Sequence, residues 1–125
     1  MRVHVRLMQI DLMSHEEKML ADSVGILTKN QLLYQELETN AKHSIQFFED
    51  CVKIKRTAEV CSETELLLNG VGKSVISSDF GKMELQTKLE NMSQKEGLWA
   101  VQYAILSNGE VVSNFLMKWK IDKLA

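Results

Sequence analysis

The last third of the chain contains, at Leu98–Ile121, the sequence LWAVQYAILSNGEVVSNFLMKWKI. Two apolar runs flank Asn108 and Gly109 in this stretch. An Asn-Gly dipeptide supplies the positive φ angles that both central residues of a type I′ turn require. The sequence therefore predicts a β-hairpin with its turn at this dipeptide.

The register of this hairpin follows from its turn. If Ser107 faces Glu110, then Tyr103 faces Asn114 and Trp99 faces Lys118. This register predicts two faces that are both rich in apolar side chains: Trp99, Val101, Tyr103, Ile105, Val112 and Leu116 on one, and Ala100, Ala104, Leu106, Val111, Phe115, Met117 and Trp119 on the other. A hairpin with one face in water alternates more cleanly. We therefore expect both faces to be covered.

Composition limits the class of protein. The chain has 125 residues, which is one domain spanning 1–125, and its net charge of −2 predicts no nucleic-acid partner. No apolar run reaches the roughly 20 residues of a membrane-spanning helix, so no membrane association is expected. Cys51 and Cys61 form neither a disulfide framework nor a zinc pattern. The sequence thus predicts a cytoplasmic protein without metal or cofactor.

The first half of the chain is predicted to be mainly helical. Apolar and charged residues alternate over 3–7, which predicts a strand with one wet face. Ser14 and Glu17 match a capping box, which predicts a helix over about 15–24. A longer helix is expected over about 29–52, because a 100° rotation per residue gathers six apolar side chains on one arc. These are Leu33, Leu37, Ala41, Ile45, Phe48 and Val52.

The second half is predicted to be mainly strands. Residues 53–72 fit either a helix or a strand, whereas 73–79 and 83–90 have strand patterns. The sum is an α+β domain in which a long central helix is wrapped by an antiparallel sheet. The final hairpin would then turn one face to the helix and the other to a second copy of the chain, in a homodimer.

Two stretches carry a resemblance to a known superfamily. Residues 25–43, where a glycine precedes the expected long helix, resemble the entry to the central helix of acyl-carrier-protein thioesterases. Residues 80–87, 108–112 and 119–122 are similar to the last three strands of that superfamily. The chain thus resembles a single hot-dog-like domain over about two-thirds of its length. It differs in holding one hot-dog unit rather than two, and in lacking a clear counterpart of the Asp, Asn and His catalytic cluster.

This resemblance implies that the protein handles acyl thioesters carried on coenzyme A or an acyl carrier protein, as a thioesterase or a dehydratase-like enzyme. On the expected helix, Glu36, Asn40 and His43 share one stripe. Glu36 or Asp11 would be the catalytic base beside His43. The substrate-binding residues would be Asn40, Ser44 and Phe47.

Other interpretations of the same residues remain open. Asn40 and Ser44 can bond nearby backbone, Glu36 and His43 can lie at the margin of the core, and Asp11 can be a turn residue. The whole chain can also be a non-catalytic helix-on-sheet module that binds a lipid-like ligand or a protein partner. A cystatin-like or NTF2-like fold has nearly the same order of elements.

Overall fold

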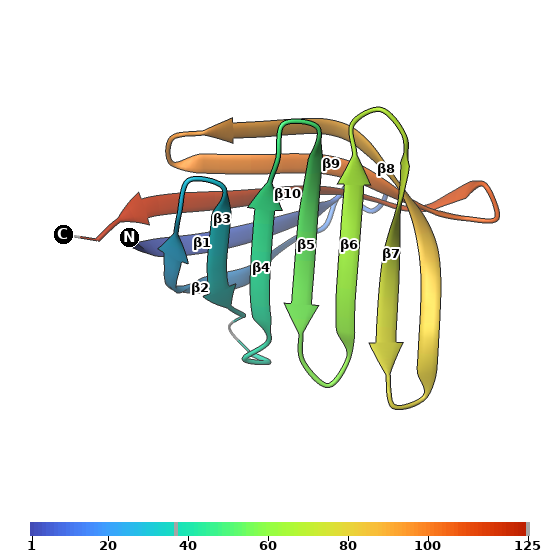
Figure 1. Cartoon of the computed structure of the whole chain (residues 1–125), viewed down its shortest axis with the longest axis horizontal. Helices are drawn as coiled ribbons and strands as arrows, with labels where there is room; N and C mark the ends of the chain where they lie inside the picture. Colours follow the sequence, from blue (N-terminus) through green and yellow to red (C-terminus); the bar gives the residue numbers. More distant parts are fainter. Residues whose placement is uncertain (37, 125) are drawn as a thin grey trace.

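The protein is a closed antiparallel barrel of ten strands, in which every strand pairs with its neighbours in sequence and the first pairs with the last (Figure 1). The computed structural model describes residues 1–36 and 38–124. The strands are β1 (Arg2–Asp11), β2 (Glu17–Leu27), β3 (Gln31–Gln35), β4 (Lys42–Phe47), β5 (Cys51–Thr57), β6 (Cys61–Leu67), β7 (Val71–Ser78), β8 (Gly81–Lys95), β9 (Leu98–Ser107) and β10 (Glu110–Lys123).

The barrel is flattened into two layers. Figure 1 shows β3–β7 side by side and roughly upright, with β9, β10 and β1 crossing behind them. Strand β8 rises beside β7 and then bends to run along β9, so it belongs to both layers (Figure 1). Its register with β9 shifts between Leu89 and Asn91. A bulge of this kind bends a strand and increases its twist, which accounts for the corner.

Two glycines allow close approach between strands. A Cβ added at Gly25 would lie 2.5 Å from the carbonyl oxygen of Leu33, at the point where β2 turns from the back layer into the front one. A Cβ at Gly72 would lie 2.1 Å from the carbonyl oxygen of Glu65. The space above Gly72 is instead crossed by Thr87, whose hydroxyl donates to that carbonyl at 2.7 Å. No other residue type fits at these two positions without moving a strand.

The barrel interior is filled by side chains. Phe47 contacts the rings of both tryptophans, with centroid distances of 4.9 Å to Trp99 and 6.3 Å to Trp119. Alternate residues of nearly every strand join this core, which includes Val3, Val5, Leu7, Leu32, Ile45, Val52, Leu66, Val101 and Ile121. The interior is therefore a packed core rather than a channel.

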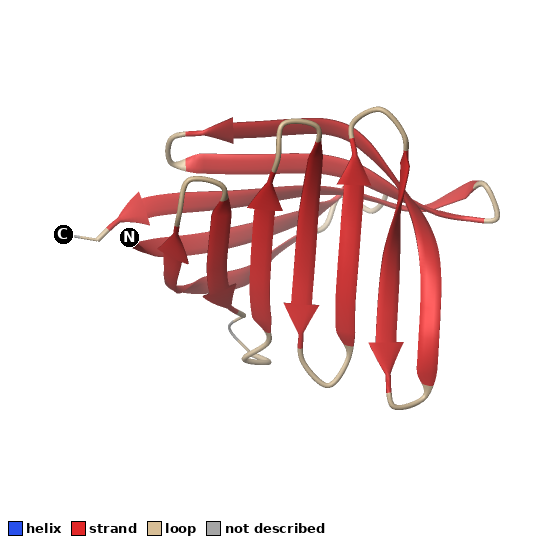
Figure 2. Cartoon of the chain, in the orientation of Figure 1, coloured by secondary structure: helices blue, strands red, loops and turns tan. Residues whose placement is uncertain are grey.

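The predicted α+β class is wrong, since the described residues contain strands but no helix (Figure 2). With no long helix, the hot-dog architecture and the cystatin-like and NTF2-like alternatives are wrong too. The expected helix over 15–24 lies mostly in β2, and Ser14 does not cap a helix but accepts from the backbone N–H of Glu16 in the β1–β2 turn. The ambiguous stretch 53–72 is mainly strand, in β5 and β6.

The expected long helix over 29–52 is in fact β3, β4 and the start of β5. The apolar residues of this segment fit both the period of a helix and the period of a strand. In the barrel the period is two, because Leu32, Ile45 and Phe47 point inward and are fully buried. Leu33 and Phe48, which the helical arc places in the core, are about two-fifths exposed. No glycine or proline marks the turns in this stretch, so the sequence carries few signals that would break a helix.

Other local predictions are confirmed. The stretch 3–7 lies in β1, most of 73–79 in β7, and 83–90 in β8. Asn108 and Gly109 have φ angles of 53° and 80°, as a type I′ turn requires, and Glu110 pairs with Ser107.

The predicted register of the last hairpin is wrong beyond its turn. A bulge between Val111 and Ser113 shifts β10 by one residue against β9. Trp99 therefore faces Trp119 instead of Lys118, and Tyr103 faces Phe115. A shift of one residue moves each side chain to the other face. Trp99, Val101, Met117 and Trp119, taken from both predicted faces, thus share one buried inward face, whereas Val111 and Val112 remain about half exposed.

Candidate functional site

A chain of hydrogen bonds runs from the core to the lower rim of the barrel. The indole N–H of Trp119 donates to the hydroxyl of Tyr34 at 2.7 Å, and this hydroxyl lies 3.1 Å from Nδ1 of His43. Nε2 of His43 bonds the carboxylate of Glu36. Since the Tyr34 hydroxyl already accepts from Trp119, it donates to Nδ1, and the proton of the neutral imidazole is on Nε2. This pattern of hydrogen bonds is therefore consistent with a neutral His43.

Glu36 ends this chain and is surrounded by donors. Nε and one terminal nitrogen of Arg56 donate to its two oxygens at 2.7 and 3.3 Å, and the hydroxyl of Thr39 donates at 2.8 Å. The side chain of Glu36 is only 11% exposed. Burial alone would raise the pKa of this carboxyl, but the bonds from Arg56, His43 and Thr39 lower the pKa to about 2. Glu36 is therefore ionised throughout the physiological range.

The pKa values of the two aromatic members also depart from their usual range. Burial lowers the pKa of His43, and the neighbouring Glu36 carboxylate opposes this only in part. Burial raises the pKa of the Tyr34 hydroxyl far above 10. Both side chains are therefore uncharged at neutral pH, and the charged members of this hydrogen-bonded group are Glu36 and Arg56.

The structure brings together two of the predicted catalytic residues, Glu36 and His43. They lie in the segment after β3 and in β4, not on one helix. Asp11 lies at the end of β1, where its carboxylate accepts from the backbone N–H groups of Met13 and Ser14. It therefore has the geometry of a turn residue.

The predicted substrate-binding residues do not converge. Asn40 lies in the β3–β4 turn with a φ of 55°, and Phe47 is buried in the core. Ser44 accepts a hydrogen bond from the side-chain amide of Gln31 at 3.1 Å. The apolar helical arc that suggested a shared substrate site does not exist in the barrel, so these three side chains lie in different environments.

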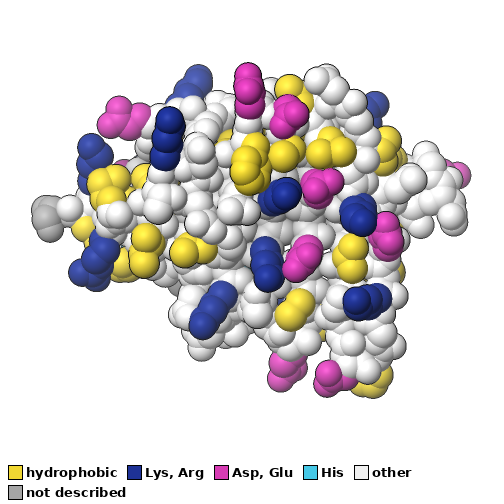
Figure 3. All heavy atoms as spheres, viewed as in Figure 1, with side chains coloured by type: hydrophobic (Ala, Val, Ile, Leu, Met, Phe, Trp, Pro, Cys, Tyr) yellow, Lys and Arg dark blue, Asp and Glu magenta, His cyan; other side chains and the backbone are white. Residues whose placement is uncertain are grey.

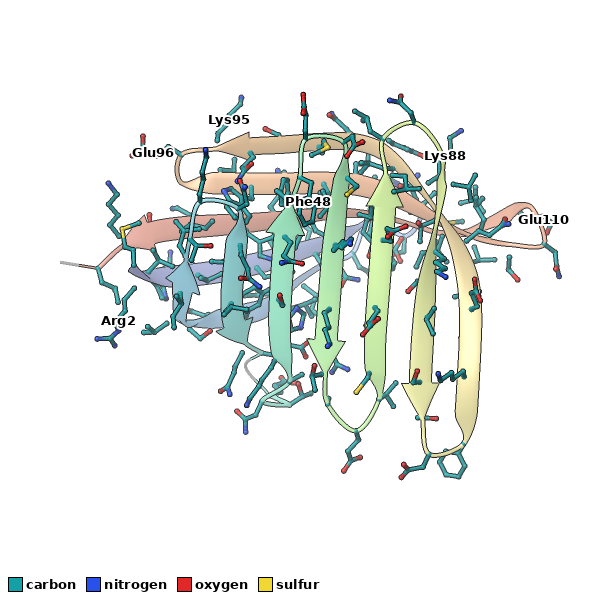
Figure 4. All side chains as sticks on the ribbon, viewed as in Figure 1. Arg2, Phe48, Lys88, Lys95, Glu96 and Glu110 are labelled. Atoms are coloured by element: carbon teal, nitrogen blue, oxygen red, sulfur yellow. The ribbon has the colours of Figure 1, made fainter. Side chains whose placement is uncertain are left out.

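A pocket of about 840 Å³ lies at one end of the barrel. It lies among the start of β1, the β2–β3 turn, the β8–β9 hairpin and the end of β10, and Lys95 and Glu96 mark that hairpin in Figure 4. The side-chain amide of Gln94 donates to the carbonyl oxygen of Lys29 at 3.1 Å, which ties the hairpin to the β2–β3 turn. The lining of the pocket includes Val3, Leu27, Thr28, Asn30, Gly97, Trp99, Ile121, Asp122 and Lys123.

The lining has an apolar floor and a polar rim. Val3, Trp99 and Ile121, which belong to the core, line the floor. Lys29, Glu96 and Lys123 stand at the rim, and Figure 3 shows Lys and Arg side chains around hydrophobic ones at this end, on the left. No local sequence pattern predicted this pocket. Gln94 and Lys29 are 65 residues apart, and no local pattern indicates that they meet.

None of the predicted site residues lines this pocket. Within residues 1–36 and 38–124, no group of three or more His, Cys, Asp or Glu side chains could hold a metal ion. The same residues include no helix long and apolar enough to cross a membrane.

Comparison with protein families gives one match, to the family described as Domain of unknown function (DUF1934), over residues 3–118. The chain belongs to this family. No curated protein matches the chain. This assignment and the barrel overturn the resemblance to hot-dog proteins. They leave nothing in support of a thioesterase, of binding to acyl-CoA or an acyl carrier protein, or of the helix-on-sheet module.

A solved structure, that of the ywiB protein from Bacillus subtilis, is similar to this DUF1934 chain with a TM-score of 0.61. The two are 15% identical, and the match covers 98% of this chain and 91% of that one. Likeness at this level of identity concerns the fold. The up-and-down closure resembles that of lipocalin-like barrels, with ten strands here where lipocalins have eight.

Proposed function

We propose that this protein binds a small organic molecule at the open end of its barrel. The observation that carries the proposal is the pocket of about 840 Å³ with an apolar floor and polar groups at its rim. Binding sites for small molecules are typically concave, apolar and about 300–1,000 Å³ in volume, with a few polar groups that orient the ligand. The pocket has each of these properties.

The floor of the pocket supports an apolar or aromatic ligand body. The ring of Trp99 packs on Phe47 at a centroid distance of 4.9 Å and is 4% exposed, so its position is set by the core. Only a small edge of this indole is open to a ligand, but contact with it costs little conformational entropy because the ring is already fixed. Polar side chains from three different segments, Lys29, Gln94 and Lys123, surround this floor.

Binding, rather than catalysis, is the activity that this arrangement supports. The side chains with shifted pKa values that bond one another, Tyr34, Glu36 and His43, are outside the pocket lining. Their hydrogen-bonding groups are engaged with one another, with Arg56 and with Trp119. We therefore assign Glu36 and His43 a structural role at the lower rim of the barrel.

The cytoplasm is the compartment that we propose for this activity, since both thiols, Cys51 and Cys61, are free. The homodimer expected from the sequence stays a prediction, which sedimentation equilibrium of the purified chain tests.

The two tryptophans provide the test, because Trp99 lines the pocket and Trp119 lies deeper, bonded to Tyr34. Indole and anilinonaphthalene sulfonate, one neutral and one anionic, are titrated into ¹⁵N-labelled protein. The two indole N–H signals are assigned with Trp99→Phe and Trp119→Phe. We expect the Trp99 signal to shift in a saturable way and the Trp119 signal to move much less. If neither probe shifts the Trp99 signal at millimolar concentration, the proposal is wrong.

A pocket-blocking variant gives a second readout. Thr28→Trp places a large ring at the rim, on a turn residue outside the core. Saturable binding of either probe is expected to weaken at least tenfold. The matched control is Asp79→Trp, an exposed residue of the β7–β8 turn outside the pocket, which should leave binding unchanged.

A further inference from the structure

Four cations lie close together on the outer face of the back layer. The strand register places Lys95, Leu98, Lys120, Arg6 and Asp22 in one row across five neighbouring strands, from β8 to β2. The next row contains Lys118, between Ala100 and Met8. We call Arg6, Lys95, Lys118 and Lys120 the basic patch, and all four are exposed.

Repulsion within the basic patch destabilises the isolated protein. Arg6 and Lys120 are direct cross-strand partners, about 5 Å apart at the backbone, and like charges in this position are destabilising. Lys118 follows on the same face of β10, about 7 Å from Lys120. Within the described part of the chain, neither Lys118 nor Lys120 has an ion-pair partner.

Lysines on the outer face of the front layer, by contrast, lie opposite acidic residues. On the outer face of β5 and β6, Lys53 pairs with Glu65, and Lys55 pairs with Glu63 with an N–O distance of 3.7 Å. Figure 3 shows this face, where Lys and Arg side chains alternate with Asp and Glu. The chain has a net charge of −2, so acidic residues are available in excess. Even so, none of the direct cross-strand partners of Lys118 and Lys120 is acidic, which is a local feature of this face.

We propose that the basic patch is a docking surface for a short, extended acidic segment of another protein. In an extended peptide, alternate side chains lie about 7 Å apart on one face, which is the spacing of Lys118 and Lys120. Carboxylates at alternate positions can therefore meet both lysines. Beside them, Leu98 and Ala100 offer an apolar strip, with Leu98 40% exposed.

The borders of the basic patch favour a short segment over a long polyanion. Asp22, which bonds His4, closes the row at β2, and Asp122 follows Lys120 on the same face of β10. A nucleic acid that continued past the patch would meet these carboxylates. The side chains between the cations are Leu98, Ala100 and Met8, so no aromatic ring there could stack on a base.

The test compares two pairs of lysines with the same spacing. Binding of a fluorescein-labelled Glu-Ala-Glu-Ala-Glu peptide is measured by anisotropy at low salt. Substituting Lys118→Gln and Lys120→Gln together is expected to weaken binding at least fivefold, and added salt should remove the difference. The control substitutes Lys53→Gln and Lys55→Gln, and affinity should change less than twofold. Equal losses in the two variants, or no binding by the parent protein, would overturn the proposal.

Two further measurements complete the test. Labelled oligothymidine is titrated in the same buffer, and tighter binding than the peptide would replace the proposal with a nucleic-acid surface. Thermal unfolding is measured without any partner. Lys120→Gln should raise the Tm, because it removes the repulsion with Arg6, whereas Lys55→Gln should not. A lower Tm for Lys120→Gln would show that Lys120 serves folding rather than docking.

Discussion

Two groups, each made of a histidine, a carboxylate and an arginine, lie in different environments of this barrel. His43 bonds Glu36, and Glu36 accepts from Arg56 at 2.7 Å. On the outer face, His4 bonds Asp22, and Nε of Arg6 lies 3.9 Å from the same carboxylate. The side chains of His43 and Glu36 are 5% and 11% exposed, whereas those of His4 and Asp22 are 27% and 38% exposed.

The comparison shows how burial changes the energetic contribution of two chemically similar groups. Water can replace any partner of His4 or Asp22, so the loss of one member leaves the others solvated. At the lower rim, Glu36 has few solvent contacts and depends on His43, Arg56 and Thr39. Removing one member of a buried group leaves an uncompensated charge or an unpaired donor, which costs far more than an exposed pair contributes.

The largest expected effect is that of Glu36→Ala. This change removes the acceptor of Arg56, His43 and Thr39 together, and we expect it to lower the free energy of unfolding by about 3 kcal/mol. Urea denaturation followed by tryptophan fluorescence measures the change. Asp22→Ala is the matched control, with an expected loss below about 1 kcal/mol. Equal losses at the two sites would show that burial does not distinguish these groups.

Tyr34→Phe should have the next largest effect. It leaves the buried indole N–H of Trp119 without an acceptor and Nδ1 of His43 without a donor, which should lower the free energy of unfolding by about 2 kcal/mol. Tyr103→Phe is a suitable control, since it removes the hydroxyl of the half-buried Tyr103 without breaking this hydrogen-bonded chain. If both changes cost the same, the hydrogen-bonded chain contributes nothing specific.

The free energy of unfolding should fall in acid because of the buried group around Glu36. The Glu36 carboxyl takes up a proton near pH 4.5 when unfolded but near pH 2 when folded, so between these values the unfolded state binds more protons. The lowered pKa of His43 acts in the same direction from about pH 6.5 downward. We expect the contribution of Glu36 to be about 2 kcal/mol at neutral pH and to be lost between about pH 5.5 and pH 2.

Denaturant unfolding at a series of pH values measures this acid dependence. Glu36→Gln should flatten the curve between pH 5 and pH 2, whereas Asp22→Asn should leave its shape close to that of the parent protein. An unchanged acid limb in Glu36→Gln would place the responsible carboxylate elsewhere.

The smallest expected effect is that of His4→Asn on the outer face. Its bond to Asp22 is partly open to water, so the free energy of unfolding should change by less than about 1 kcal/mol. Added salt should reduce the difference further. A loss as large as that of Glu36→Ala would mean that the outer group is shielded from solvent by a partner.

The sequence predicted local structure best where a turn and alternation act together. Asn108 and Gly109 predicted the hairpin turn, and the period-two pattern at 3–7 predicted a strand. The segment 29–52 misled, because its apolar residues satisfy a helical period as well as a strand period. The bulge between Val111 and Ser113, which places Trp99 opposite Trp119 on the neighbouring strand, was not predicted, because no local pattern marks it.

The candidate sites show the same contrast between local patterns, which were predicted, and long-range contacts, which were not. Glu36 and His43 were expected to be neighbours and they are, although a helix was the wrong reason. Arg56 was not connected with them, because it comes from β5, and Trp119 arrives from the far end of the chain. The pocket at the open end and the basic patch join residues from several strands, and no local pattern indicates either.

The sequence by itself determined the turn at Asn108 and Gly109, the individual strands with clean alternation, and the absence of any long apolar run. These properties depend on backbone conformations and side-chain directions within a few residues. Only the tertiary structure decided that residues 29–52 form strands, that Glu36 meets Arg56, and that Lys29 meets Gln94. Closing the barrel pairs β1 with β10, and this long-range pairing selects one of the local conformations that the sequence permits.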